Sequence, residues 1–126
     1  MKRRDWAILT TLTFVVLSLV ALNWPRILFG TAELLAEKRP VLLADAQWND
    51  QSSARLFKTR FAPGTATTKL VEWLEQQDFS INADKFAAER KVFSFPCTER
   101  VTVSWSSDRD GRLATAEAKV QEAGCL

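Results

Sequence analysis

The sequence contains no histidine and no tyrosine, and only two cysteines and four glycines among its 126 residues. The absence of histidine removes the commonest general base and the commonest ligand of transition metals. The glycines stand singly, so no glycine-rich loop is present to hold a phosphate group. A nucleophilic Ser, Thr or Cys would need a lysine or a carboxylate as its base, and no motif marks such a pair. We therefore expect no catalytic residue, no cofactor and no metal ion.

Charge is absent from the twenty residues between Trp6 and Pro25, WAILTTLTFVVLSLVALNWP. A helix of this length rises about 30 Å, which matches the hydrocarbon core of a bilayer. Its threonine and serine hydroxyls can bond to carbonyls one turn earlier, which keeps them satisfied in lipid. Trp6 and Trp24 bracket the run at the depth that aromatic rings prefer. The pattern predicts a transmembrane helix over 6–25, with the lipid bilayer as a partner.

The net charge of +2 is confined to the N-terminus. Lys2, Arg3, Arg4 and Asp5 supply three of the 17 basic and one of the 15 acidic residues, so the remainder is neutral. The positive-inside rule then predicts a cytoplasmic tail over 1–5 and a translocated C-terminal domain, in the periplasm of a Gram-negative bacterium if the membrane is its inner one. A neutral domain also argues against a nucleic-acid partner. No small-molecule substrate is evident.

The same run also fits a cleavable signal peptide. It is longer than a usual signal core of about 7–15 residues, and no small-x-small cleavage site follows it closely. We expect it to be retained as an anchor, with cleavage as the alternative. Ala7 and Thr11 form a small-xxx-small step that can pair helices, although a single lipid-facing helix is the simpler interpretation.

Residues 26–50 form a predicted juxtamembrane segment. Pro25 can open a new helix at its first turn, or the helix can extend the anchor out of the membrane. Arg39-Pro40 ends this helix. The residues that follow show no regular spacing of apolar side chains, and we interpret them as a linker that packs somewhere.

The domain is predicted over 51–126, beginning with two helices. Asp50 is a candidate N-cap for a short helix from Gln51 to about Lys58. Pro63-Gly64 predicts a turn, after which Thr65 can cap a helix that runs to about Asp78. The apolar stripe of this second helix predicts core packing, with a partner groove as the alternative: Leu70, Val71, Trp73 and Leu74.

From Phe79 onward, apolar residues recur at every second position, as in a strand, instead of at helical spacing. Phe79 and Ile81 alternate with polar residues, 82–90 fits a loop or a helical turn, and 92–96 fits a strand with Phe93 and Phe95 on one face. A half-buried antiparallel strand is predicted where Val101, Val103 and Trp105 alternate with polar residues.

A hairpin is predicted next, over Ser107-Asp108-Arg109-Asp110-Gly111. Asp108 and Asp110 resemble two calcium ligands, but the loop length and a later Glu are missing. The return strand over 112–121 has Leu113 and Val120 as its best apolar members. Two helices followed by about three antiparallel strands predict an α+β domain.

Cys97 and Cys125 are both in the predicted translocated part, where disulfides persist. A bridge closing a loop of about 29 residues would restrict the unfolded chain by roughly 3.5 kcal/mol, a large share for a small domain. A redox-active pair is the alternative, but no CxxC context supports it. Metal binding by two thiols without histidine is weaker still.

At Phe61-x-Pro63-Gly64-Thr65 leading into Leu70-Val71-x-x-Leu74, then Trp105 and an Asp-Gly hairpin, residues 52–126 resemble the SmpA/BamE-like group of small envelope domains. The resemblance implies two helices on a three-stranded antiparallel sheet and a non-catalytic scaffolding or binding role. The chain departs from the group by its membrane anchor, which replaces a lipobox, and by its cysteine pair.

These observations favour a non-catalytic, single-pass inner-membrane protein whose disulfide-closed periplasmic domain serves protein binding or envelope assembly. The alternative is a small accessory subunit of a larger membrane complex, in which the anchor makes the contacts. A periplasmic enzyme is a third possibility. In the first two cases a protein partner is expected.

Overall fold

The computed structural model describes residues 3–126, without the side chains of residues 3, 4, 32 and 33. The chain consists of an N-terminal helical unit that ends at Ala36 and a compact unit, Glu37–Leu126. We call the second unit the domain.

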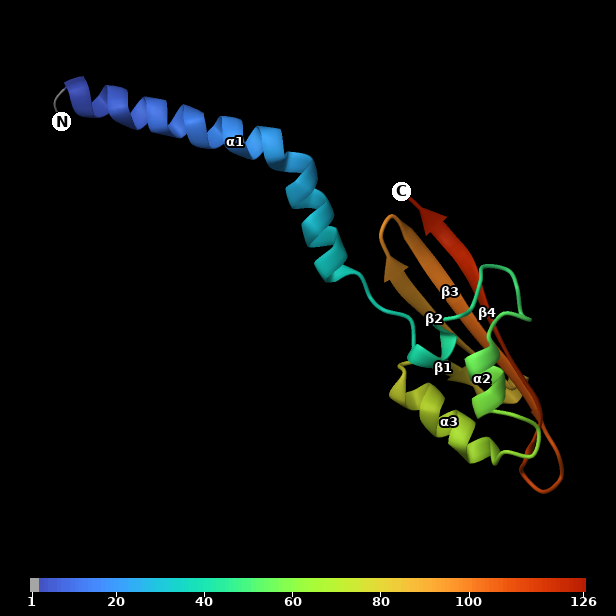
Figure 1. Ribbon diagram of the computed structural model, residues 1–126. Helices are drawn as coiled ribbons and strands as arrows, with labels where there is room; N and C mark the ends of the chain where they lie inside the picture. Colours follow the sequence, from blue (N-terminus) through green and yellow to red (C-terminus); the bar gives the residue numbers. More distant parts are fainter. Residues whose placement is uncertain (1–2) are drawn as a thin grey trace. The chain divides into compact units, whose positions relative to one another are not determined.

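The N-terminal unit is one helix, α1 (Arg3–Leu35), which contains Pro25 in its interior. The helix therefore extends beyond the predicted run, as the second of the two alternatives had it, and no new helix begins at Pro25. Figure 1 shows a bend part-way along α1, and an interior proline is a common cause of a bend because its ring removes one backbone hydrogen bond. The hydroxyls of Thr11, Thr13 and Ser18 donate to carbonyls four residues earlier at 2.8 Å, as predicted.

The domain contains two α-helices, α2 (Arg55–Arg60) and α3 (Thr67–Gln76). A one-turn 3-10 helix, η1 (Val41–Leu43), precedes them. The predicted caps are wrong for both α-helices. Helix α2 starts later than predicted, and the Asp45 carboxylate accepts the N–H groups of its first residues, Arg55 and Leu56. Asp50 instead accepts from Ser52 in the preceding turn.

Helix α3 begins two residues after Thr65. Ala66 stands at its N-cap without a side-chain hydrogen bond, and the backbone of Thr65 is paired with Leu113. The turn before α3 has the expected form, since Gly64 adopts a φ of +92°, which a residue with a Cβ rarely does.

The sheet has four antiparallel strands in the order β1-β2-β3-β4. They are β1 (Ser80–Asn82), β2 (Ala87–Ser94), β3 (Cys97–Ser107) and β4 (Leu113–Cys125), with η2 (Ala83–Lys85) between the first two. The prediction of about three strands was one short, because the short strand β1 pairs with the start of β2. The α+β class is confirmed.

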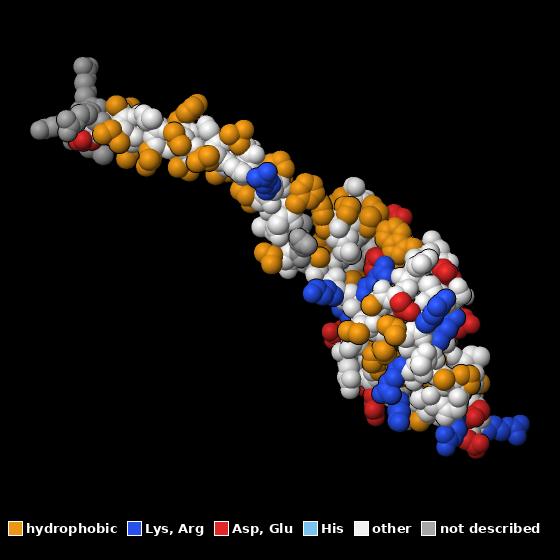
Figure 2. Space-filling model, in the orientation of Figure 1, with side chains coloured by type: hydrophobic (Ala, Val, Ile, Leu, Met, Phe, Trp, Pro, Cys, Tyr) orange, Lys and Arg blue, Asp and Glu red, His pale blue; other side chains and the backbone are white. Residues whose placement is uncertain are grey.

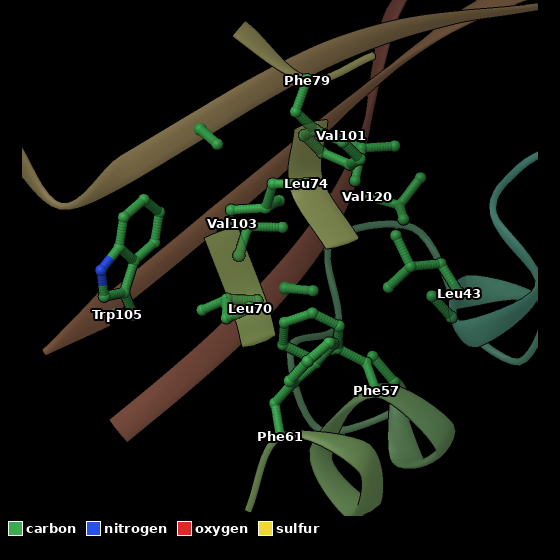
Figure 3. Packing of buried hydrophobic residues seen from close by; sticks show 14 of the residues in the cluster. Leu43, Phe57, Phe61, Leu70, Leu74, Phe79, Val101, Val103, Trp105 and Val120 are labelled. Carbon is green, nitrogen blue, oxygen red and sulfur yellow. The ribbon is translucent and has the colours of Figure 1, made fainter. Parts of the chain in front are cut away.

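Both α-helices cover one face of the sheet (Figure 1). The alternation predicted for β3 places Val101, Val103 and Trp105 on this face, where they are buried. They pack against Leu70 and Leu74 of α3 (Figure 3), so the apolar stripe of that helix faces the core. Leu113 and Val120, the best apolar members of the predicted return strand, are buried in the same core.

Four aromatic rings join the helices to the beginning of the sheet. The centroids of Phe57, Phe61 and Trp73 lie 5.1 to 5.7 Å apart, and Trp73 lies 5.7 Å from Phe79. Tilted rings at these separations stabilise a small core beyond their buried area.

The first strand of the β2–β3 hairpin differs from its prediction at both ends. Strand β2 starts at Ala87, inside the stretch predicted as a loop or helical turn, and ends at Ser94, so Phe95 lies in the turn and not on the strand. Val92 is fully buried, whereas Phe93 points to the other face of the sheet. At the β3–β4 turn the hairpin forms as predicted, with Gly111 at a φ of +73°.

Candidate functional site at the strap and the hairpin end

Residues 37–50, which we call the strap, belong to the domain and pass along its sheet. The N–H of Glu37 donates to the carbonyl of Phe93 at 2.8 Å, and the N–H of Asn49 donates to the carbonyl of Val120 at 2.8 Å. Between these two points Leu43 and Ala46 enter the core. The segment interpreted as a linker that packs somewhere is therefore part of the fold.

The strap is fixed by an ion pair with the one buried charged residue of the described chain, Glu99, which is 4% exposed. The guanidinium of Arg39 binds its carboxylate with two nitrogens, and the Nε–Oε2 distance is 2.6 Å. The indole Nε1 of Trp48 donates to Oε1 at 2.7 Å, and Arg39 also donates to the carbonyl of Ala46 at 2.7 Å. All polar atoms of this cluster are thereby satisfied.

These contacts shift the pKa of both charged partners. The hydrogen bonds from Arg39 hold the pKa of Glu99 below its usual value, against the opposing effect of burial, and Trp48 contributes in the same direction. The same contact raises the pKa of Arg39. Glu99 is therefore a carboxylate occupied by three donors, which makes it a structural anion and a poor candidate for a general base.

An open groove of about 730 Å³ lies along β1 and β2. Two of its three carboxylates are paired: Glu37 lies 3.8 Å from the guanidinium of Arg90, and Glu89 lies 3.2 Å from that of Arg100. No group of three or more His, Cys, Asp or Glu side chains that could hold a metal ion occurs within the described residues. The groove residues include Glu37, Asp78, Ser80, Glu89, Lys91 and Thr102.

The end of the domain beside the start of the strap is formed by the β2–β3 turn and the C-terminus, and we call it the hairpin end. Cys97 and Cys125 are direct neighbours across β3 and β4 and form a disulfide. The N–H of Leu126 donates to the carbonyl of Pro96 at 2.9 Å. The bridge thus closes the C-terminus onto the turn, as its sequence position predicted.

The residues predicted to form the membrane anchor lie on α1. Asp5–Thr31 is long and apolar enough to cross a membrane, and its side chains are not buried in the protein. Trp6 and Trp24 are 65% and 54% exposed, and Figure 2 shows many hydrophobic side chains along α1, interrupted by polar atoms and one basic side chain. Lys2 and the side chains of Arg3 and Arg4, the predicted determinants of orientation, lie outside the described part of the chain.

Sequence reasoning missed the cluster of Arg39, Trp48 and Glu99. One signal for it was present. Glu99 lies two and four residues before Val101 and Val103, so in a strand its side chain is on the same inward face, and a charged residue occupies a core position of β3. A charge at such a position needs a partner, but nothing in the local sequence indicates that the partner lies 60 residues earlier.

Comparison of the chain with family models, with curated proteins and with solved structures found no match.

Proposed function

We propose that this chain is a non-catalytic, single-pass membrane protein that displays a small, disulfide-closed domain at the membrane surface for protein binding or envelope assembly. In this proposal α1 is retained as the anchor, the N-terminus is cytoplasmic and the domain lies in the periplasm of a Gram-negative bacterium.

The observation that carries the proposal is the shortness of the link between anchor and domain. Ala36 alone separates Leu35, the end of α1, from Glu37, whose N–H is already bonded to β2. An apolar helix of this length needs lipid or other helices around it, since its side chains are exposed in the chain alone. A domain joined to it by one residue stays at the membrane surface, which suits a scaffolding or binding role.

The chemistry of the domain also supports a non-catalytic role. Its buried acid, Glu99, is committed to Arg39 and Trp48, and two of the three acids of the groove, Glu37 and Glu89, lie beside arginines. The SmpA/BamE-like resemblance adds the expectation of a binding module, and it stays a proposal because the chain has a fourth strand and a membrane helix that the group's pattern does not include.

A second candidate function is that of a small accessory subunit, in which α1 contacts the other subunits and the domain serves as a cap. The exposed apolar side chains along α1 favour it, because neighbouring helices can cover them as well as lipid can.

An exchange of the anchor tests the two functions against each other. The full-length protein and a variant with an unrelated transmembrane helix in place of residues 6–31 are tagged after Leu126, solubilised gently, and compared by native size and by mass spectrometry of co-purifying proteins. Under the first function the same stoichiometric partner is retained by both forms. Under the second it is lost with the native helix, and a monomer without partner in both forms contradicts both functions.

A further inference from the structure

We infer that the hairpin end of the domain inserts its exposed apolar side chains into the headgroup layer of the bilayer beside the anchor. This inference rests on the proposed function, because it requires α1 to span the membrane. It goes beyond that function by naming a second membrane contact, made by the domain itself.

The length of the connecting chain limits how far the domain can lie from the membrane. The apolar span Asp5–Thr31 contains 27 residues, which as a helix cover about 40 Å, the thickness of a bilayer with its headgroups. Five residues separate Thr31 from Glu37, and even fully extended the six steps between them reach only about 20 Å. The hydrogen bond from Glu37 to Phe93 then ties the hairpin end to this short tether. The hairpin end is therefore the part of the domain that the covalent chain holds nearest to the membrane.

The hairpin end carries exposed apolar side chains. Phe93 and Phe95 are each 39% exposed, and Leu126 is 93% exposed. The hydrogen bond between Leu126 and Pro96 keeps the C-terminal leucine beside the turn that carries Phe95. Apolar side chains grouped in this way lose contact with water when they enter the interfacial layer, which stabilises a surface-bound state.

The opposite end of the domain is charged instead of apolar. The β3–β4 turn there contains exposed charged residues, Asp108, Arg109, Asp110 and Arg112. Figure 2 shows blue and red side chains at the position where Figure 1 shows this turn. Strand β3 runs from one end to the other over 11 residues, which is about 35 Å. With the hairpin end in the headgroups, the charged turn lies well outside the membrane.

Charged residues near the hairpin end are of both signs. Lys38 and Lys91 are exposed and suit lipid phosphates, whereas Glu122 is exposed and does not. The inference is accordingly one of apolar contact with the headgroup layer and requires no particular anionic lipid.

Site-specific photocrosslinking to lipid tests the inference. The photoreactive residue p-benzoylphenylalanine is introduced at the position of Phe93 in the full-length protein, which is reconstituted into vesicles of phosphatidylethanolamine and phosphatidylglycerol. The matched control carries it at the position of Phe86. That residue is more exposed, at 52%, and it lies seven residues earlier, just before the start of β2, about 23 Å away along the strand direction.

After irradiation, intact-mass spectrometry is expected to show several-fold more phospholipid adduct at position 93 than at position 86. Equal adduct at both positions, no lipid adduct at position 93, or an adduct at position 93 with protein instead of lipid would overturn the inference. Carbonate extraction of the same vesicles separates this failure from that of the proposed function: a protein that stays in the membrane but gives no lipid adduct overturns only the hairpin contact. A protein that carbonate removes overturns both.

Discussion

Glu99 is the residue on which the attachment of the strap depends. Its carboxylate receives three donors from Arg39 and Trp48, two residues that are separated from it by more than 50 positions in the sequence. Burial of a charge is unfavourable by itself, and the complete set of hydrogen bonds offsets that cost. Removal of one partner therefore costs more free energy than the pair contributes.

We predict that Glu99→Gln lowers the free energy of unfolding by about 2 kcal/mol, because Arg39 keeps its charge and loses its counter-ion. The 22% exposure of the Arg39 side chain limits the loss, since water can reach part of the guanidinium. Glu117→Gln, at an exposed position of β4, is the matched control and is expected to change stability by less than about 0.5 kcal/mol. Urea unfolding of the full-length protein in detergent, followed by near-ultraviolet circular dichroism, measures both. Equal stability of the two variants would contradict the role of Glu99.

The lowered pKa of Glu99 also predicts a dependence of stability on pH. A carboxyl whose pKa is lower in the folded state than in the unfolded state stabilises the folded protein at any pH above its ordinary pKa of about 4.5. This contribution is lost as the pH falls through the folded-state pKa. The stability difference between wild type and Glu99→Gln is therefore expected to be largest above pH 5 and to shrink in acid. Unfolding curves of both proteins from pH 7 to pH 3 check this, and a difference that grows in acid would show that the sign is wrong.

Among the elements, the pair of β3 and β4 determines how the C-terminus is held. The register shifts between Thr98 and Glu99, so only two residue pairs follow the irregularity, Thr98 with Gly124 and Cys97 with Cys125. A strand end beyond a bulge frays easily because few ladder hydrogen bonds hold it. The disulfide supplies the covalent closure that this short end lacks.

We predict that the double variant Cys97→Ser, Cys125→Ser is less stable than the oxidised protein by about 3.5 kcal/mol, the loop-closure entropy of the 28-residue separation. Hydrogen exchange is expected to accelerate most at Gly124 and its neighbours. Denaturant unfolding and exchange mass spectrometry measure the two effects. As a check on the premise, labelling of free thiols in denatured, unreduced protein should find none, and quantitative labelling of both cysteines would refute the bridge.

The N-caps of both α-helices differ from the positions that residue type predicts. Asp50 and Thr65 have the right residue type for an N-cap, but each is used in the preceding turn, and Asp45 holds the start of α2 from ten residues away. Local preference proposes several cap positions, and the packing of the strap and of the turn beside Leu113 selects among them.

In the molecule as a whole, the strap sets the boundary of the domain. Leu43 and Ala46 contribute to the core, and Arg39 and Trp48 satisfy Glu99. A domain that began at residue 51 would lack all four side chains and would expose a buried carboxylate without its counter-ion.

We predict that the fragment Glu37–Leu126 folds as a soluble domain, whereas a fragment 51–126 does not fold or unfolds at a much lower denaturant concentration. The reason is the loss of core burial together with an unpaired charge, which amounts to several kcal/mol in a small domain of limited total stability. Circular dichroism and denaturant unfolding of the two purified fragments provide the measurement. Similar unfolding midpoints would show that the strap is dispensable.

Features that depend on local chemistry and on the spacing of apolar residues could be predicted from the sequence alone. The uncharged run from Trp6 to Pro25 predicted a long apolar helix, the alternation at Val101, Val103 and Trp105 predicted an inward-facing strand, and Asp110-Gly111 predicted a hairpin turn. Each follows from residues that are close in sequence, so the pattern alone is sufficient. The tertiary structure decided the features that join distant residues: the pairing of β1 with β2, the position of the strap and the ion pair of Arg39 with Glu99. No local pattern specifies such a contact, because the burial of a carboxylate indicates only that a partner exists and the fold determines which residue it is.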